Sequence, residues 1–155
     1  GASSRYGTAP PKQVELLPRV LAALHRARTL DGVLVVIGAH DLETDAPTVR
    51  CAEWERGPGA SLRCGLAALA PDVDAAVVVL ADGPDLDARA VDRVVGAWGD
   101  DGGDVLAASY GGVRLHPVLL ARAEWSRVPD AGARALEARL VPCDDLTPPG
   151  DVDER

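Results

Sequence analysis

A continuous apolar run in the middle of the chain, residues 76–80, leads into Ala81-Asp82-Gly83-Pro84. A short apolar run bounded by turn residues is typical of a strand buried on both faces, as in a parallel sheet. Ligands of open α/β sheets bind beyond the carboxyl ends of such strands, which is where Asp82 lies. The same residues also fit a plain turn with an aspartate cap, and turn statistics alone favour that interpretation.

Composition excludes several classes of protein. The chain has 155 residues and a net charge of −8, and an acidic surface repels a phosphate backbone, so we expect no nucleic-acid partner. A single bound nucleotide is not excluded by this charge. We expect one domain of this length, with an aliphatic core because Phe and Met are absent. No run reaches about 18 apolar residues and no signal peptide is apparent, so a cytoplasmic location without a membrane segment is expected.

The cysteines are few and far apart. Cys51, Cys64 and Cys143 are odd in number and contain no CxxC spacing. This pattern argues against a cysteine metal site and against a disulfide scaffold. We therefore predict reduced thiols in an intracellular protein.

Apolar periodicity and turn residues predict alternating helices and strands. The predicted helices cover residues 14–28, 61–70, 85–98 and 130–140. The predicted strands cover residues 33–37, 48–51, 76–80, 105–110, 113–120 and 141–143. This alternation predicts an α/β fold with a largely parallel sheet. Gly111-Gly112 predicts a hairpin between two of the strands, which makes the sheet mixed at that end.

Prolines and cap residues refine the limits of two helices. Pro18 is tolerated only near a first turn, so the first helix is expected to begin close to Leu17. Asp85 or Asp87 is expected to cap the helix that ends at Trp98.

Two further positions leave structural alternatives open. Ser61 is expected to cap the second helix, within which Gly65 indicates either a close approach by a ligand or a tight helix–strand contact. His116-Pro117 falls inside a predicted strand, where proline requires a sheet edge or a bulge.

The first residues form a loop of small side chains with two cations, Arg5 and Lys12. Such a loop can let its main-chain N–H groups approach a phosphate, although its terminal position also fits a solvated segment. A parallel sheet of this kind normally has a strand before the loop. We therefore expect that the first strand precedes Gly1 and is not part of this sequence.

Five segments in order resemble the motifs of the molybdenum-cofactor nucleotidyltransferases, particularly their cytidylyltransferase-like (MobA/MocA-like) branch. These segments are residues 1–7 with Lys12, residues 57–66 containing Ser61-Leu62-Arg63-Cys64-Gly65-Leu66, Leu80-Ala81-Asp82-Gly83-Pro84, His116-Pro117 with residues 130–134, and Asp151-Val152-Asp153. The resemblance implies a Rossmann-like nucleotidyltransferase fold, a glycosyltransferase-A-like three-layer sandwich with a mostly parallel mixed sheet.

The resemblance also implies a reaction, in which a nucleoside monophosphate passes from a nucleoside triphosphate, with CTP expected, to a phosphorylated acceptor such as molybdopterin. Pyrophosphate is released and Mg²⁺ is the implied cofactor. Arg5, Lys12 and Asp82 would be catalytic, and Asp82 and Asp153 would hold the metal. The implied nucleotide contacts are Gly1, Ala2, Ser3, Ser4, Gly38, Ser61, Leu62, Arg63 and Gly65. His116 and Pro117 would contact the acceptor, and a molybdoenzyme or chaperone is the implied protein partner.

Two other functions fit the same motifs. One is a nucleotide-binding domain of this fold that no longer catalyses. The other is a guanylyltransferase for a different small phosphorylated acceptor, or a sugar-phosphate nucleotidyltransferase. The nucleotide base, the acceptor and the oligomeric state stay open at this stage.

Overall fold

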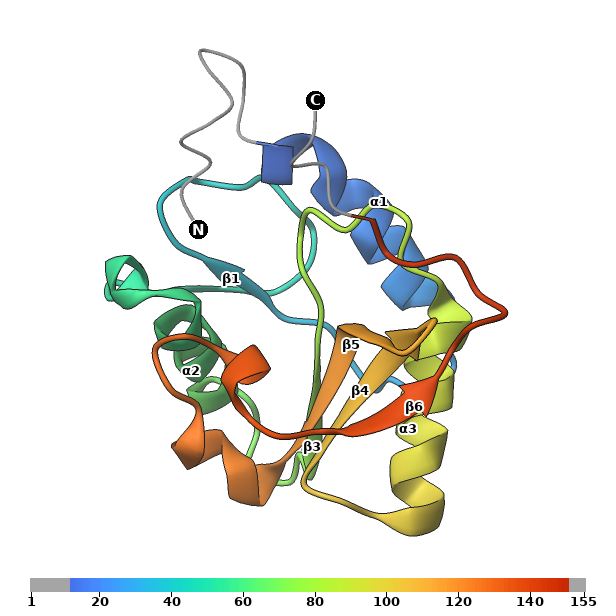
Figure 1. The fold of residues 1–155 in the computed structure, drawn as a ribbon. Coiled ribbons are helices and arrows are strands. Elements are labelled where there is room, and N and C mark those ends of the chain that lie inside the picture. The colour runs from blue at the N-terminus through green and yellow to red at the C-terminus, as the bar shows by residue number, and fades with distance from the viewer. Residues whose placement is uncertain (1–11, 151–155) are drawn as a thin grey trace.

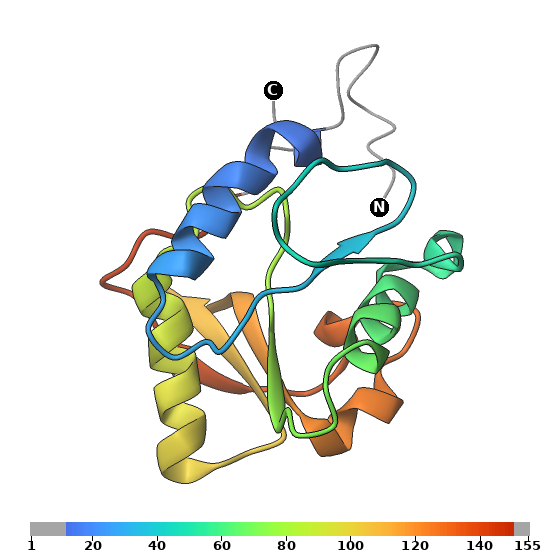
Figure 2. The same ribbon diagram turned by 180° about the vertical axis from the view of Figure 1, so that it is seen from behind.

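The structure, a computed structural model, describes residues 12–150 (Figures 1 and 2). Its helices are α1 (Lys12–Arg26), α2 (Pro58–Ala67) and α3 (Ala88–Asp101), with short 3₁₀ turns at Trp54–Arg56, Arg122–Arg127 and Ala133–Ala135. Its strands are β1 (Val35–Ile37), β2 (Thr48–Arg50), β3 (Ala75–Val78), β4 (Val105–Tyr110), β5 (Val113–Ala121) and β6 (Arg139–Pro142).

The strands in this part of the chain form two sheets, a four-stranded one in the order β3-β5-β4-β6 and the pair β1-β2. Strand β5 runs antiparallel to both of its neighbours, whereas β4 and β6, and likewise β1 and β2, are parallel. The predicted α/β class and the mixed sheet are therefore confirmed, as is the hairpin at Gly111-Gly112, which joins β4 to β5.

Helices cover both faces of the larger sheet, which gives three layers (Figure 2). Strand β4 is buried along its whole length, and its side chains alternate between the two faces. Leu106 and Ala108 pack with α3 residues such as Val94, whereas Val105 and Ala107 pack on the side of α2. Helix α1 lies against α3. A third apolar cluster joins these two helices and includes Val20, Ala23 and Leu24 from α1 and Val91 from α3.

Pro117 lies in a bulge of an inner strand. Ala107 of β4 pairs with Val118 and Ser109 with Arg114, so a single β4 residue faces three residues of β5. Of the two alternatives for this proline, the bulge is confirmed and the sheet edge is wrong. Pro117 has no N–H to donate, and the pairing of β3 with β5 ends at Val78 opposite Val118. Strand β3 therefore ends two residues earlier than the apolar run predicts.

Three helix predictions need correction. Helix α1 already includes Lys12 and contains Pro18, whereas a start near Leu17 was expected. Helix α2 begins at Pro58, not at Ser61, because Gly57 takes the positive φ of 130° at the cap and proline suits the first helical position. The helix predicted over residues 130–140 is wrong, since only a 3₁₀ turn forms there before β6 begins.

Of the two predicted caps of α3, Asp85 and Asp87, the structure confirms Asp87. Asp87 is the N-cap of this helix, and the Asp87 carboxylate accepts the main-chain N–H of Arg89. No helix within residues 12–150 is both long and apolar enough to cross a membrane.

The cysteine prediction is wrong for one pair. Cys51, directly after β2, forms a disulfide with Cys64 of α2, with a Cα–Cα distance of 5.7 Å. The packing of α2 against β1 and β2 brings the two cysteines together, which their sequence spacing does not reveal. Cys143 is a free, buried thiol, as expected.

Candidate functional site

Asp82 lies in the turn that follows β3, four residues beyond the carboxyl end of that strand at Val78. Main-chain hydrogen bonds shape the turn, from the Gly83 N–H to the Leu80 oxygen and from the Leu86 N–H to the Gly83 oxygen, each 3.3 Å long. The side chain of Asp82 is partly exposed. Both sequence interpretations are thus compatible with the backbone, because a turn is present and it also presents a carboxylate beyond a strand end.

His116 of β5 lies close to this turn. The antiparallel register places Val118 opposite Val78, so the chain on the His116 side of Val118 faces the residues that lead to Asp82. Burial is the main cause that lowers the pKa of His116, and Arg114 lowers it further, while the Asp82 carboxylate acts in the opposite sense. Since the usual value is about 6.5, the imidazole is neutral at pH 7. The structure therefore brings two predicted site residues together.

The end of the described chain returns to the same turn. The Asp85 N–H donates to the Pro149 oxygen at 2.9 Å, and a Cβ on Gly83 would lie 3.5 Å from Pro149. Gly150, the last residue described, lies against Asp85. The residues before the Asp151-Val152-Asp153 motif are thus held beside Asp82.

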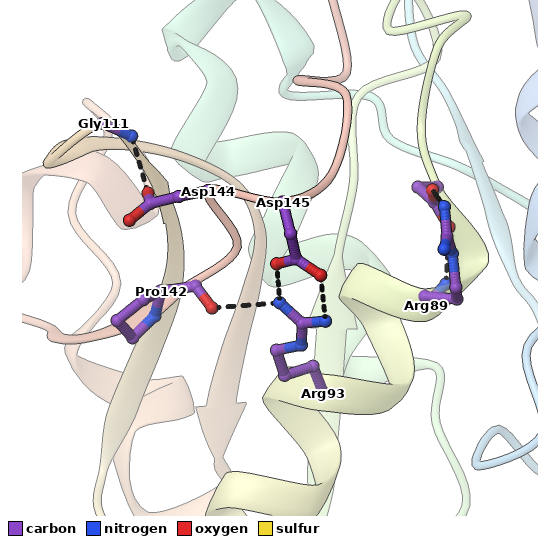
Figure 3. Close-up of polar contacts among 7 residues, drawn as sticks. Arg89, Arg93, Gly111, Pro142, Asp144 and Asp145 are labelled. Carbon is purple, nitrogen blue, oxygen red and sulfur yellow. Dashed lines mark hydrogen bonds and ion pairs between the residues drawn. The ribbon is translucent and has the colours of Figure 1, made fainter.

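Two carboxylates fix this returning segment, as Figure 3 shows. The Arg93 guanidinium on α3 donates to both carboxylate oxygens of Asp145, at 2.6 and 3.0 Å, and also to the Pro142 oxygen. The Asp144 carboxylate accepts the Gly111 N–H at 2.7 Å. The hydrogen bonds from Arg93 lower the pKa of Asp145 to about 2. None of these anchors was predicted from the sequence.

Arg63, a predicted nucleotide contact, has its guanidinium engaged by protein groups. It donates to the Val128 oxygen at 2.8 Å and to the Asp130 carboxylate at 2.5 Å. The hydrogen bond from Arg63 to the Asp130 carboxylate is the largest cause that lowers the pKa of Asp130, and Arg56 adds to the effect. The N–H of Gly59 donates to the Asp130 main-chain oxygen at 2.8 Å. The start of α2 is therefore attached to the chain around Asp130.

Packing accounts for two glycines of the predicted nucleotide site. A Cβ on Gly65 would lie 2.7 Å from the Val36 side chain of β1, so the tight helix–strand contact is present. A Cβ on Gly38 would lie 3.0 Å from the Cβ of Trp54. Ser61 is partly exposed in the first half of α2, whereas Leu62 packs on the apolar cluster beneath the helix. Nucleotide contact at these positions stays a prediction.

Several predicted residues lie beyond the described part of the chain. They are Gly1, Ala2, Ser3, Ser4, Arg5 and Asp153. Lys12 is the first residue of α1. Their roles at a triphosphate or a metal stay predictions.

A metal at this site would need more than the side chains described. Within residues 12–150 no group of three or more His, Cys, Asp or Glu side chains could hold an ion. Mg²⁺ is commonly bound through one or two carboxylates together with substrate phosphates, so the donor type of Asp82 fits such an ion.

The sequence patterns predict no individual role for Arg114 or Asp130. Arg114 donates to the main-chain oxygens of Leu136 and Ala133, at 2.6 and 3.0 Å. Its position two residues before His116 was the only available signal, and strand periodicity alone does not reveal such a contact. Asp130 opens one of the motif segments, but its partner Arg63 is 67 residues away in sequence.

Three solved structures have a fold similar to that of this chain. The crystal structure of Rv0371c from Mycobacterium tuberculosis H37Rv shares 24% identity, covers 99% of this chain and 88% of its own, and has a TM-score of 0.77. A homolog of this protein from Mycobacterium sp. strain JC1 shares 21% identity over 93% of this chain and 82% of its own, with a TM-score of 0.74. The crystal structure of a complex of Rv0371c from Mycobacterium tuberculosis H37Rv with manganese shares 21% identity over 94% of this chain and 88% of its own, with a TM-score of 0.73. These similarities show a common fold and confirm the Rossmann-like expectation.

The family model described as the MobA-like NTP transferase domain matches residues 1–142. The chain therefore belongs to the MobA-like NTP transferase domain family, as the motifs indicated. Membership supports nucleotidyltransferase activity in general. No functionally curated protein matches the sequence significantly.

Proposed function

We propose that the protein transfers a nucleoside monophosphate from a nucleoside triphosphate, CTP first among them, to a phosphorylated small molecule such as molybdopterin. The observation that supports this most is the convergence at the turn after β3, where Asp82 lies near His116 and Pro149 is bonded to Asp85. This convergence occurs in a member of an NTP transferase family. The preference for CTP rests on the resemblance of residues 61–66 to the cytidylyltransferase-like branch.

Asp82 and Asp153 are the proposed carboxylate ligands of Mg²⁺. The complex of Rv0371c with manganese is a precedent for a divalent ion in a protein of this fold. Carboxylate oxygens are hard ligands that suit Mg²⁺, and the described chain ends beside Asp82 just before the Asp153 motif. When bound, the ion would neutralise negative charge on the phosphates.

The remaining proposed roles concern binding and orientation, since phosphoryl-type transfer leaves little covalent work to the protein. Arg5, Lys12 and the main-chain N–H groups of residues 1–4 would hold the triphosphate. A phosphate oxygen of the acceptor attacks the α-phosphorus, the bond from the α-phosphorus to the bridging oxygen breaks, and pyrophosphate leaves. The acceptor is already an anion, so no general base is required. Neutral His116, with Pro117, would orient this acceptor without adding charge.

The test measures pyrophosphate release with CTP, GTP, ATP and UTP in turn, with Mg²⁺ and molybdopterin present. We expect release with CTP that depends on the acceptor, on the metal and on Asp82. Asp82-dependent release with GTP instead would move the proposal to the guanylyltransferase alternative. Triphosphate binding in calorimetry without any metal-dependent product would favour a non-catalytic nucleotide-binding domain and contradict the proposal.

A further inference from the structure

Residues 128–136, here called the strap, lie beside α2 in both views of the fold (Figures 1 and 2). The strap contains the 3₁₀ turn Ala133–Ala135 but no longer helix. Arginines from two different elements hold it, Arg63 from α2 and Arg114 from β5. It therefore connects the start of α2 with the strand that carries His116.

The contact between the strap and α2 is close as well as hydrogen-bonded. A Cβ on Gly59 would lie 1.7 Å from the Pro129 oxygen, and one on Gly57 would lie 2.5 Å from the Asp130 oxygen. Only glycine permits this approach of two main chains. The Gly59 N–H then donates to Asp130, so one N–H at the helix start is satisfied by the strap.

The guanidinium groups of Arg63 and Arg114 each bind the strap through two N–H donors. Arg63 donates to the Val128 oxygen through Nη1 and to the Asp130 carboxylate through Nη2. Arg56 reaches the other carboxylate oxygen of Asp130 at 3.6 Å. Arg114 donates to two strap carbonyls. Paired donors of this kind fix orientation as well as distance.

We propose that Arg63, Arg114 and Asp130 are positioning residues, which act through the strap to set the start of α2 relative to His116. This inference rests on the proposed function, in which the start of α2 lies on the nucleotide side of the site and His116 on the acceptor side. The strap then joins these two sides. The inference also changes the expected role of Arg63 from a nucleotide contact to a group that acts through Asp130.

A double-mutant cycle distinguishes these two roles of Arg63. The variants are Arg63→Ala, Asp130→Ala and the double substitution, and the first readout is CTP binding by calorimetry with Mg²⁺. We expect each single change to weaken binding about fivefold, the scale of one surface-type ion pair, and the double change to be no worse than either single one. A direct nucleotide contact would instead make Arg63→Ala harmful and Asp130→Ala nearly silent, which would overturn the proposal.

The second readout does not need a ligand. Hydrogen exchange of the main-chain N–H groups in residues 57–63 is compared between the wild-type protein and each variant, with the melting temperature as a check on folding. We expect faster exchange there in all three variants, and partial recovery in Arg63→Lys, which keeps the charge but loses the second donor. Unchanged exchange in Asp130→Ala would overturn the proposal.

Arg139→Ala is the matched control. Arg139 also donates to two main-chain oxygens, those of Ala97 and Gly102, at the opposite end of α3 from the site. We expect wild-type exchange in residues 57–63 and wild-type CTP binding in this variant. If the wild-type protein binds no CTP, the proposed nucleotide fails, while the exchange data still decide the positioning role.

Discussion

The turn after β3 and the start of α2 are built by different kinds of interaction. Main-chain hydrogen bonds shape the turn, from Gly83 to Leu80 and from Asp85 to Pro149. At the start of α2, a side-chain ion pair between Arg63 and Asp130 adds to the main-chain bond from the Gly59 N–H to the Asp130 oxygen. A side-chain change at the turn should therefore alter chemistry with little effect on structure. A change at the start of α2 should alter structure first and function through it.

The largest expected effect is on activity and concerns the turn. We expect Asp82→Asn to lower nucleotidyl transfer by about 100-fold or more, because a ligand that offsets phosphate charge contributes several kcal/mol to the barrier. The melting temperature should stay near that of the wild-type protein, because the main chain forms the turn. Both are measured on the same preparation, by pyrophosphate release and by thermal unfolding.

Asp101→Asn is the control for this prediction, because Asp101 is an exposed carboxylate at the end of α3. It should change neither activity nor melting temperature. If Asp82→Asn unfolded the protein, Asp82 would be a structural turn residue and the contrast between the two regions would be lost.

The next effect is on stability and concerns the start of α2. In Gly59→Ala the new Cβ would overlap the Pro129 oxygen, which belongs to the main chain and cannot turn aside. We expect a loss of about 2 to 3 kcal/mol in the free energy of unfolding, the upper part of the range for overpacking. Urea unfolding monitored by circular dichroism measures it.

Gly65→Ala in the same helix is the comparison. Its Cβ would meet a methyl group of the Val36 side chain and no main-chain atom, and alanine is favoured over glycine inside a helix by about 1 kcal/mol. We expect a net change below about 1 kcal/mol. Equal losses in the two variants would show that the strap contact is no tighter than an ordinary helix–strand contact.

Local sequence patterns predicted the features that depend on neighbouring residues. The Asp87 cap, which was one of two candidates, the Gly111-Gly112 hairpin and the bulge alternative at Pro117 each follow from the chemistry of one or two adjacent residues. The resemblance assigned Asp82 and His116 to one site, and the pairing of β3 with β5 then brings their segments together.

Local sequence patterns could not predict contacts between segments that are distant in the sequence. Residues 131–140 are rich in helix-forming side chains, yet the carbonyls of Ala133 and Leu136 accept hydrogen bonds from Arg114. A tertiary contact there competes with helix formation, and propensity does not contain it. The Cys51–Cys64 disulfide and the Arg63–Asp130 pair also join distant segments, so the prediction of reduced thiols was wrong for that pair and the role of Arg63 at the nucleotide stays a prediction.

A smaller effect concerns the pH dependence of stability at the turn. Burial lowers the pKa of His116 in the folded protein, so below about pH 6.5 the unfolded chain binds a proton that the folded protein does not. We expect the free energy of unfolding to fall as the pH decreases from 7 to 5, and His116→Gln to lose part of this slope. His40→Gln, a change at an exposed position, should keep the wild-type slope. An unchanged slope in His116→Gln would contradict the buried, neutral imidazole.

The smallest effect concerns the anchor of the returning segment, which resembles the strap in its use of a guanidinium. The hydrogen bonds from Arg93 lower the pKa of Asp145 from 3.8 to about 2, so this pair stabilises the fold above the unfolded value and the contribution disappears as the pH falls toward 2. We expect Arg93→Met to be less stable than the wild-type protein at pH 6, with the difference shrinking between pH 4 and pH 2. Both partners are partly exposed, so the difference at pH 6 should be modest and should decrease with added salt. A constant difference across this range would mean that Arg93 acts through its bond to the Pro142 oxygen and its packing, and that the charge of Asp145 contributes nothing to holding the segment beside Asp82.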